Sequence, residues 1–213
     1  MPRSIPRSKL FIDGGPGTAV SEAYRILRTN IEYAQGERRI KTIAISSSTQ
    51  GEGKSATAAN LAAAFADSKK KVLLVDANLR DPIQQSIFDV PNRHGLSTLL
   101  GGQDELGDVA VATTIPYLTL LPAGPIPSNP AELLGSERMA QLLEEAKPSY
   151  DVILIDTPAV LSFADAQIMA VQCDSVLMVA GKGTVKKKTL GKAASVLEQV
   201  NARVLGVALN EAR

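Results

Sequence analysis

Residues 42–55 read TIAISSSTQGEGKS, and the alanine-rich stretch ATAANLAAAFA follows at once at 56–66. A short apolar strand, a glycine-containing turn and a helix in this order aim backbone N–H groups and the positive end of the helix dipole at one place. Lys54 and Ser55 close the turn, where a lysine suits the β and γ phosphates of a nucleotide and a hydroxyl suits Mg²⁺. The stretch therefore predicts a phosphate-binding loop.

The loop departs from the strict phosphate-loop pattern at Ser48, which stands where a glycine is usual. The tripeptide Gly53-Lys54-Ser55 is weak evidence by itself, since it recurs by chance in about one chain in ten of this length. A second stretch, DVILIDTP at 151–158, is an apolar strand that ends in Asp156, where a carboxylate holds the Mg²⁺ shell in nucleotide-binding proteins. Together the two stretches favour a nucleotide site over an ordinary strand turn.

A third apolar strand also ends in a carboxylate. VLLVDANLRDP at 72–82 places Asp76 at the strand end and Arg80 four residues later. An aspartate in this position often does no more than cap the following turn. Consecutive strands of a β-α-β unit lie close together, so beside the phosphate loop we expect Asp76 to face the γ-phosphate.

Short aliphatic runs alternate with helical patterns along the rest of the chain. We expect strands at 42–46, 71–76, 117–121, 151–156, 175–180 and 203–209, and helices at 55–67, 130–146, 164–171 and 185–200. This alternation predicts an α/β fold, a doubly wound and mostly parallel sheet with helices on both faces, the three-layer sandwich of P-loop NTPases. Ligands of such sheets bind at the carboxyl ends of the strands.

The N-terminal region divides into two parts. Residues 1–20 are rich in Pro, Gly, Ser and Arg, and we expect them to form a flexible arm without core contacts. From Ser21, apolar residues recur every three or four positions, which predicts an amphipathic helix capped by Ser21 and ended by Gly36. Residues 21–213 are then a single domain.

Composition excludes several classes of function. A net charge of +1 over 213 residues lacks the positive excess that nucleic-acid binding needs. One cysteine, Cys173, and one histidine, His94, exclude an internal disulfide and a zinc site rich in Cys or His. We expect Cys173 to fill the core and His94 to lie in a loop. No apolar stretch is long enough to span a bilayer, and the composition fits the reducing cytoplasm.

At this point the residues resemble the bacterial tyrosine kinases of capsule and exopolysaccharide synthesis. The resemblance rests on GEGKS, VLLVDANLR, VILIDTP, the helix SEAYRILRTNI with Glu22, Arg25 and Arg28, and GPIPSNPAELL at 124–134. MinD and ParA ATPases share the fold but carry a lysine where this chain has Thr49. A cargo-positioning ATPase of that kind is therefore the least favoured alternative.

The resemblance implies an autophosphorylating, ATP-dependent protein tyrosine kinase that regulates capsular or exopolysaccharide synthesis and export. It implies three catalytic residues, Lys54, Asp76 and Arg80, with Asp76 as the base or orienting group for the tyrosine hydroxyl. The residues implied for ATP are Gln50, Gly51, Glu52, Gly53, Lys54, Ser55, Ala56 and Asn210, and those for Mg²⁺ are Ser55, Asp76 and Asp156. Arg80 is implied either to orient the loop or to contact phosphate.

The resemblance also implies partners. The helix with Glu22, Arg25 and Arg28 supports a homo-oligomeric ring in relatives, while without the resemblance these residues read as a self-paired charged helix face. Other implied partners are protein tyrosine substrates and the cytoplasmic segment of a membrane activator of the polysaccharide copolymerase type. That activator would place the chain in the cytoplasm, peripheral to the inner face of the membrane.

Two departures from the family pattern support another hypothesis. Asn78 stands where members commonly have a second acid, and an amide brings no negative charge and cannot take a proton. The sequence stops at Arg213 without the usual tyrosine cluster, and its four tyrosines, at positions 24, 33, 117 and 150, are scattered. The second hypothesis is a nucleotide-dependent regulatory switch with weak or no kinase activity that binds the membrane activator.

Overall fold

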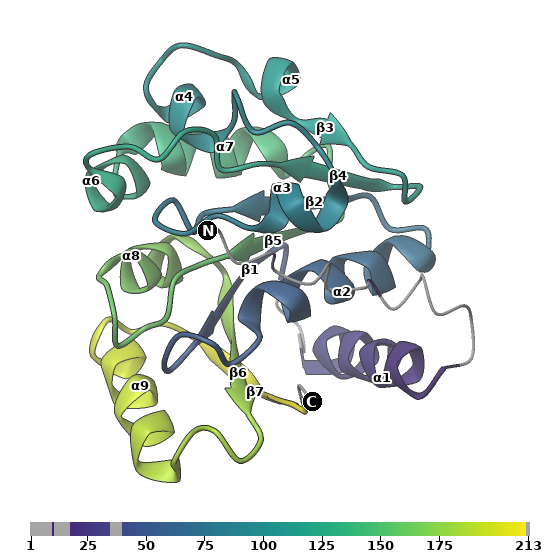
Figure 1. Ribbon diagram of the computed structural model, residues 1–213, viewed down its shortest axis with the longest axis vertical. Helices are drawn as coiled ribbons and strands as arrows, with labels where there is room; N and C mark the ends of the chain where they lie inside the picture. Colours follow the sequence, from purple (N-terminus) through teal and green to yellow (C-terminus); the bar gives the residue numbers. More distant parts are fainter. Residues whose placement is uncertain (1–9, 11–17, 35–39, 212–213) are drawn as a thin grey trace, which may run out of the picture.

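The computed structural model describes residues 10, 18–34 and 40–211. Within these residues seven strands form one sheet in the order β3-β4-β2-β5-β1-β6-β7, parallel throughout except for the short edge strand β3, which runs antiparallel to β4 (Figure 1). The strands are β1 (Thr42–Ser47), β2 (Val72–Asp76), β3 (Val111–Ala112), β4 (Leu118–Leu121), β5 (Val152–Asp156), β6 (Ser175–Gly181) and β7 (Val204–Asn210). The predicted α/β sheet is confirmed.

Helices cover both faces of the sheet, as predicted (Figure 1). They are α1 (Ala19–Ala34), α2 (Lys54–Asp67), α3 (Gln84–Phe88), α4 (Leu96–Leu100), α5 (Leu106–Val109), α6 (Pro130–Leu134), α7 (Glu137–Ala146), α8 (Asp165–Gln172) and α9 (Lys187–Gln199). Successive side chains of a strand point to opposite faces of the sheet: Leu74 packs toward α1 and α2, and Leu73 packs toward α7. The buried strands explain why their sequences are continuously apolar.

Two details of the predicted elements are wrong. The helix expected at 130–146 is split at Gly135 and Ser136, because the Ser136 Oγ accepts a hydrogen bond from the Met139 N–H (3.3 Å) and starts a new helix there. The cap of α1 is Thr18 and not Ser21: the Thr18 Oγ1 accepts the Ser21 N–H (3.2 Å), and α1 begins at Ala19. The expected stop at Gly36 lies outside the described residues.

Residues 1–20 are also not wholly free of core contacts. Leu10 is 9% exposed and belongs to the apolar cluster formed by α1, α2 and the sheet. The absence of core contacts expected for this segment is therefore wrong at Leu10. Residues 1–9 and 11–17 lie outside the described part of the chain.

Strand order decides where the site forms. β5 lies between β1 and β2, so β2 is not the direct neighbour of the strand that leads into the phosphate loop. The connection from β1 to β2 leaves room for one strand between them, and β5, which comes later in the chain, pairs with both. All three strands end at the same edge of the sheet, which brings the loop and the two strand-end aspartates together.

The described helices contain no segment long and apolar enough to cross a membrane.

Candidate active site

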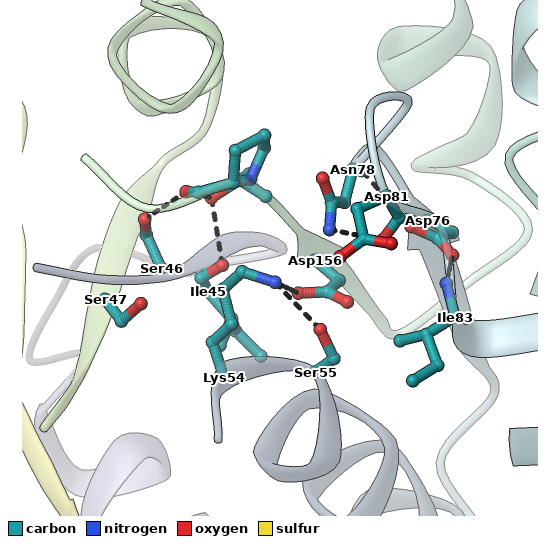
Figure 2. A network of polar contacts seen from close by, with 12 residues as sticks. Ile45, Ser46, Ser47, Lys54, Ser55, Asp76, Asn78, Asp81, Ile83 and Asp156 are labelled. Atoms are coloured by element: carbon teal, nitrogen blue, oxygen red, sulfur yellow. Dashed lines mark hydrogen bonds and ion pairs between the residues drawn. The ribbon is translucent and has the colours of Figure 1, made fainter. Parts of the chain in front are cut away.

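The predicted phosphate loop joins β1 to α2. Gly51 and Gly53 have left-handed backbone conformations, with φ of 85° and 86°, which non-glycine residues rarely adopt. The turn delivers Lys54 as the first residue of α2, so the unpaired N–H groups of the first helical turn face the cleft. The Lys54 Nζ lies 2.9 Å from the Ser55 Oγ and 3.7 Å from the Asp156 Oδ1 (Figure 2).

The Glu52 side chain stabilises the phosphate loop and connects it to the end of β6. Its Oε1 accepts hydrogen bonds from the Thr49 N–H (2.5 Å) and hydroxyl (2.9 Å), and its Oε2 accepts one from the Gly181 N–H (3.2 Å). The residue is 2% exposed. Its carboxylate therefore shapes the loop against β6, and only its backbone remains for the nucleotide contact predicted from the sequence.

Asn210 at the end of β7 also supports the loop. Its Nδ2 donates to the Glu52 carbonyl (3.1 Å), and a Cβ on Gly53 would lie 1.9 Å from that same nitrogen. The backbone angle at position 53 therefore favours glycine, and a side chain there would displace the Asn210 amide from the loop. Asn210 lines a separate cavity between α1 and β7.

The two strand-end aspartates are neighbours across the sheet. Asp76 on β2 and Asp156 on β5 are paired in register, and both are fully buried. Asp76 accepts N–H groups from Asn78 (3.2 Å), Ile83 (3.1 Å) and Gln84 (3.0 Å), so it does organise the following turn as the simpler interpretation held. It also lies beside the carboxylate that faces Lys54 (Figure 2).

Burial, and then the negative charge of Asp156, raise the pKa of Asp76 to about 7, although three backbone N–H groups oppose the rise. An aspartate in an unfolded chain has a pKa of about 3.9. Between these two pH values the folded protein keeps a proton on Asp76 that the unfolded chain releases. The stability that protonated Asp76 contributes to the free energy of unfolding is therefore fully present below about pH 3.9, and it is lost as the pH rises to about 7.

We therefore expect the metal-free protein to lose stability as pH rises through this window, with no further loss from Asp76 above it. Urea unfolding at a series of pH values measures the free energy, and Asp76→Asn should show a flatter profile because the amide does not titrate. Parallel profiles for the two proteins would contradict the assignment.

Sequence reasoning missed Gln84, the first residue of α3. Its Nε2 donates to the Asp156 Oδ2 (2.8 Å) and to the Ser55 carbonyl (3.0 Å), and its backbone N–H reaches Asp76. The side chain is fully buried. Gln84 thus connects both aspartates and the start of α2, and it turns the Asp156 Oδ1 toward Lys54. No motif marks it, because its partners come from three separate elements.

Gln84→Leu should weaken Mg²⁺ binding about 10-fold or more, the cost typical of losing a residue that orients a metal ligand. The variant keeps the size of the side chain but leaves the Asp156 Oδ2 without its donor. Titration of Mg²⁺ at a fixed ATP concentration measures the effect. The half-buried neighbour Gln85, whose Nε2 donates to the Pro82 carbonyl (3.2 Å) and not to Asp156, offers a matched control as Gln85→Leu, which should leave the Mg²⁺ dependence unchanged. Equal Mg²⁺ dependence of both variants would contradict this role.

Asn78, which stands where the family commonly has a second acid, holds the turn after β2 through its side-chain amide. The Asn78 Nδ2 donates to the Asp81 carbonyl (2.7 Å), and the Asp81 Oδ2 accepts from the Gln50 Nε2 (3.2 Å). The amide therefore closes the turn, a task that a carboxylate cannot perform because it has no donor. The side-chain oxygen of Asn78 is the part left for a ligand.

Arg80 points across the cleft to α8. Its Nε and Nη2 donate to the two carboxylate oxygens of Asp165 (2.9 and 3.0 Å), which is fully buried. Of the two roles expected for Arg80, orientation of the loop is the one these contacts support. Neither Asp165 nor this pairing was foreseen from the sequence.

These elements enclose a cleft of about 560 Å³ at the carboxyl edge of the sheet. Of the predicted site residues, those that line it are Gln50, Gly51, Gly53, Lys54, Ser55, Ala56 and Arg80. Asp76 and Asp156 lie buried behind its wall, and Glu52 and Asn210 support the loop. The cleft thus brings together most of the predicted nucleotide residues.

The residues present fit Mg²⁺ and a nucleotide. Within the described residues, the Asp156 Oδ1 is buried without a hydrogen-bond partner, and the hydroxyl of Ser55 lies beside the same lysine. The described chain has no cluster of three or more His, Cys, Asp and Glu residues that could hold a metal alone. Mg²⁺ suits such a sparse site, because it is usually bound by one or two carboxylates together with substrate phosphates.

Glu22, Arg25 and Arg28 lie on α1 as predicted. Arg25 pairs with Glu22 (2.5 Å) and with Asp67 (3.2 Å), and the Arg28 Nη1 donates to the Ala64 carbonyl (2.9 Å). Arg25 and Arg28 thus connect α1 to the end of α2. An oligomeric role for this helix stays a proposal.

Cys173 and His94 do not line the cleft. Burial raises the pKa of the Cys173 thiol, and its side chain packs against two apolar clusters, as expected for a residue that fills the core. His94 lies in a loop, as predicted, with its Nδ1 3.0 Å from the Asp104 carboxylate.

Comparison with known families matches residues 40–204 to the AAA domain family. The tyrosine-protein kinase YwqD of Bacillus subtilis (strain 168) is 42% identical over 195 residues, which is 92% of this chain and 82% of that protein. The putative tyrosine-protein kinase CapB of Staphylococcus aureus is 35% identical over 204 residues, 96% of this chain and 90% of that protein. The tyrosine-protein kinase Etk of Escherichia coli (strain K12) is 37% identical, but the match covers only 28% of that longer protein.

Solved structures give the same result. The chimerical protein CapA2B2 superimposes with a TM-score of 0.91 at 37% identity and covers 94% of this chain and 88% of that chain. The kinase domain of Escherichia coli Etk gives 0.89 at 36% identity, with 92% and 76% covered. The cell division ATPase MinD of Pyrococcus furiosus gives 0.69 at 27% identity, with 80% and 71% covered, so the wider P-loop fold is shared as expected. The chain belongs to the bacterial tyrosine kinase family.

Proposed function

We propose that this chain transfers the γ-phosphate of Mg-ATP to protein tyrosines and so regulates capsular or exopolysaccharide synthesis and export. The observation that carries the proposal is the meeting of Lys54, Ser55 and Asp156 at one wall of the cleft, with Asp76 in register beside Asp156. A structural neighbour, MinD of Pyrococcus horikoshii at 26% identity, is a complex with Mg-ADP, which supports the choice of nucleotide and metal.

Each residue has a role that its position supports. Lys54 and the N–H groups of the first turn of α2 neutralise the phosphates, and Ser55 and Asp156 hold Mg²⁺. When bound, Mg-ATP supplies the phosphoryl group and the positive charge that offsets its developing negative charge. Asp76 accepts the proton of the tyrosine hydroxyl, and a pKa near the working pH suits a general base.

The partners follow from the family. We propose that the chain acts in the cytoplasm at the inner face of the membrane, held there by the cytoplasmic segment of a copolymerase-type activator. The structural neighbour CapA2B2 is a chimerical protein, and this supports an association with a partner chain. Assembly into a homo-oligomeric ring through α1 is proposed on the same grounds.

Product analysis tests the function. The chain is incubated with Mg-ATP and a tyrosine-containing tail peptide, with and without the activator segment, and phosphotyrosine and free phosphate are measured separately. The proposal predicts phosphotyrosine on the peptide. Release of free phosphate alone, stimulated by a partner, would instead indicate an ATPase of the MinD type.

Asn78 favours a second candidate, a nucleotide-dependent switch with little or no transfer. The site holds two buried carboxylates where a third acid is common in the family, and the Asn78 amide is engaged by the Asp81 carbonyl. Tight Mg-ATP binding without phosphotyrosine would support this candidate, and robust transfer would exclude it.

A further inference from the structure

One wall of the cleft carries an aromatic side chain to which the nucleotide roles give no task. Phe163 lines the cleft beside Pro158, Ala159 and Ser162, in the segment that connects β5 to α8. The residue is 43% exposed. An aromatic ring in this state offers apolar area and a flat face to whatever enters the cleft.

Arg80 packs against the ring of Phe163. The guanidinium carbon of Arg80 lies 4.1 Å from the ring centroid, a cation–π distance. Arg80 is itself fixed by two parallel hydrogen bonds to Asp165, a fully buried carboxylate in the first turn of α8. Because two of its nitrogens are used in this way, Arg80 serves as a support for the ring more than as a free phosphate ligand.

The depth of the acid restricts which hydroxyl can reach it. Asp76 is fully buried behind the wall of the cleft and does not line it, whereas Phe163 lines the cleft and is partly exposed. Ile83 and Ile87 add further apolar surface to the lining of the cleft, and Lys54 and the phosphate loop add polar groups. A serine or threonine hydroxyl sits next to its own backbone, but a phenol hydroxyl projects beyond a rigid apolar ring. The arrangement therefore fits an aromatic acceptor.

We propose that Phe163 is the platform for the ring of the acceptor tyrosine and that Arg80 and Asp165 are positioning residues that hold this platform. The inference rests on the proposed kinase function and deepens it, because it names the side chain that selects tyrosine over serine and threonine.

The test is a steady-state measurement of transfer to a tyrosine peptide. Phe163→Ala should raise the KM for the peptide about 10-fold, because the variant loses a stacked aromatic contact. The KM for ATP and the kcat should stay within about twofold, and Phe163→Trp should restore the peptide KM. Leu161→Ala is the matched control: Leu161 lies in the same segment and is 38% exposed but does not line the cleft, so neither KM should change.

Arg80→Lys tests the support. Lysine keeps the charge but loses the planar fork, so the peptide KM should rise while the KM for ATP stays constant. A rise in the KM for ATP in either variant would place these residues at the nucleotide and overturn the inference. An unchanged peptide KM in Phe163→Ala, with active wild-type protein, would overturn this inference alone. Absence of any transfer by the wild-type protein would overturn the kinase proposal together with it.

Discussion

Lys54→Met lowers the rate of phosphate transfer to tyrosine by about 10²–10³-fold, the cost typical of losing one preorganised group that stabilises transition-state charge. Methionine keeps the unbranched shape of the side chain, so the loop and α2 should fold as before. What is lost is the cation that lies 2.9 Å from the Ser55 hydroxyl and 3.7 Å from the Asp156 carboxylate. Initial rates at saturating Mg-ATP measure the effect.

The exposed Lys192 on α9 provides the control for this variant. Lys192→Met removes the same charge from the same residue type at a position that does not line the cleft, and its rate should equal that of the wild type. A Lys54→Met protein that keeps more than a tenth of the wild-type rate would contradict the role given to this lysine.

Asp76→Asn should lower kcat by about 10²–10⁴-fold, the range for removal of a general base. The amide has a single oxygen, which can still accept the Ile83 and Gln84 N–H groups that bond to the Asp76 Oδ2, whereas its NH2 group cannot accept the Asn78 N–H. The turn after β2 should therefore keep two of its three hydrogen bonds to this side chain. The amide cannot take the proton of the tyrosine hydroxyl. The affinity for ATP should fall much less than kcat, because Lys54 and the loop remain.

The exposed Asp108 of α5 serves as control, since Asp108→Asn removes one carboxylate outside the cleft. Its transfer rate should match the wild type. Equal losses of kcat in the two variants, or a loss of ATP affinity in Asp76→Asn that accounts for its whole effect, would contradict the assignment of Asp76 as base.

The parts of the site that could be predicted from sequence are those built locally. The stretch from Thr42 to Ser55 contains its own strand, turn and helix start, so the position of Lys54 follows from a single motif. The strands ending in Asp76 and Asp156 were recognisable for the same reason. The resemblance already implied that both aspartates serve one Mg²⁺, but the strand order was not predicted, because the insertion of β5 between β1 and β2 depends on packing between distant segments.

The residues that sequence reasoning missed act through partners far away in the chain. Gln84 meets Asp156 across 72 positions, and Arg80 meets Asp165 across 85. A glutamine or an aspartate outside a motif carries no signal of such a contact. The short helices α3, α4 and α5 escaped prediction as well, since four or five residues are too few to show helical periodicity.

The sequence and the structure lead to different interpretations of Asn78. From the sequence it is an acid lost from a metal site, whereas in the fold its amide donates to the Asp81 carbonyl and closes the turn that carries Arg80. The structure thus gives the amide a task of its own. Whether transfer proceeds with this residue in place decides between the kinase and the switch.

The most direct test of the account is the transfer of labelled γ-phosphate from Mg-ATP to tyrosine on an added tail peptide, with the activator's cytoplasmic segment present and Lys54→Met as the blank. We predict label on tyrosine well above that blank, which would show that the cleft lined by Lys54, with Asp76 and Asp156 buried behind its wall, is a working kinase site with Asn78 in place. Label no higher than the blank, in protein shown to bind ATP, would contradict the kinase and leave the nucleotide-dependent switch.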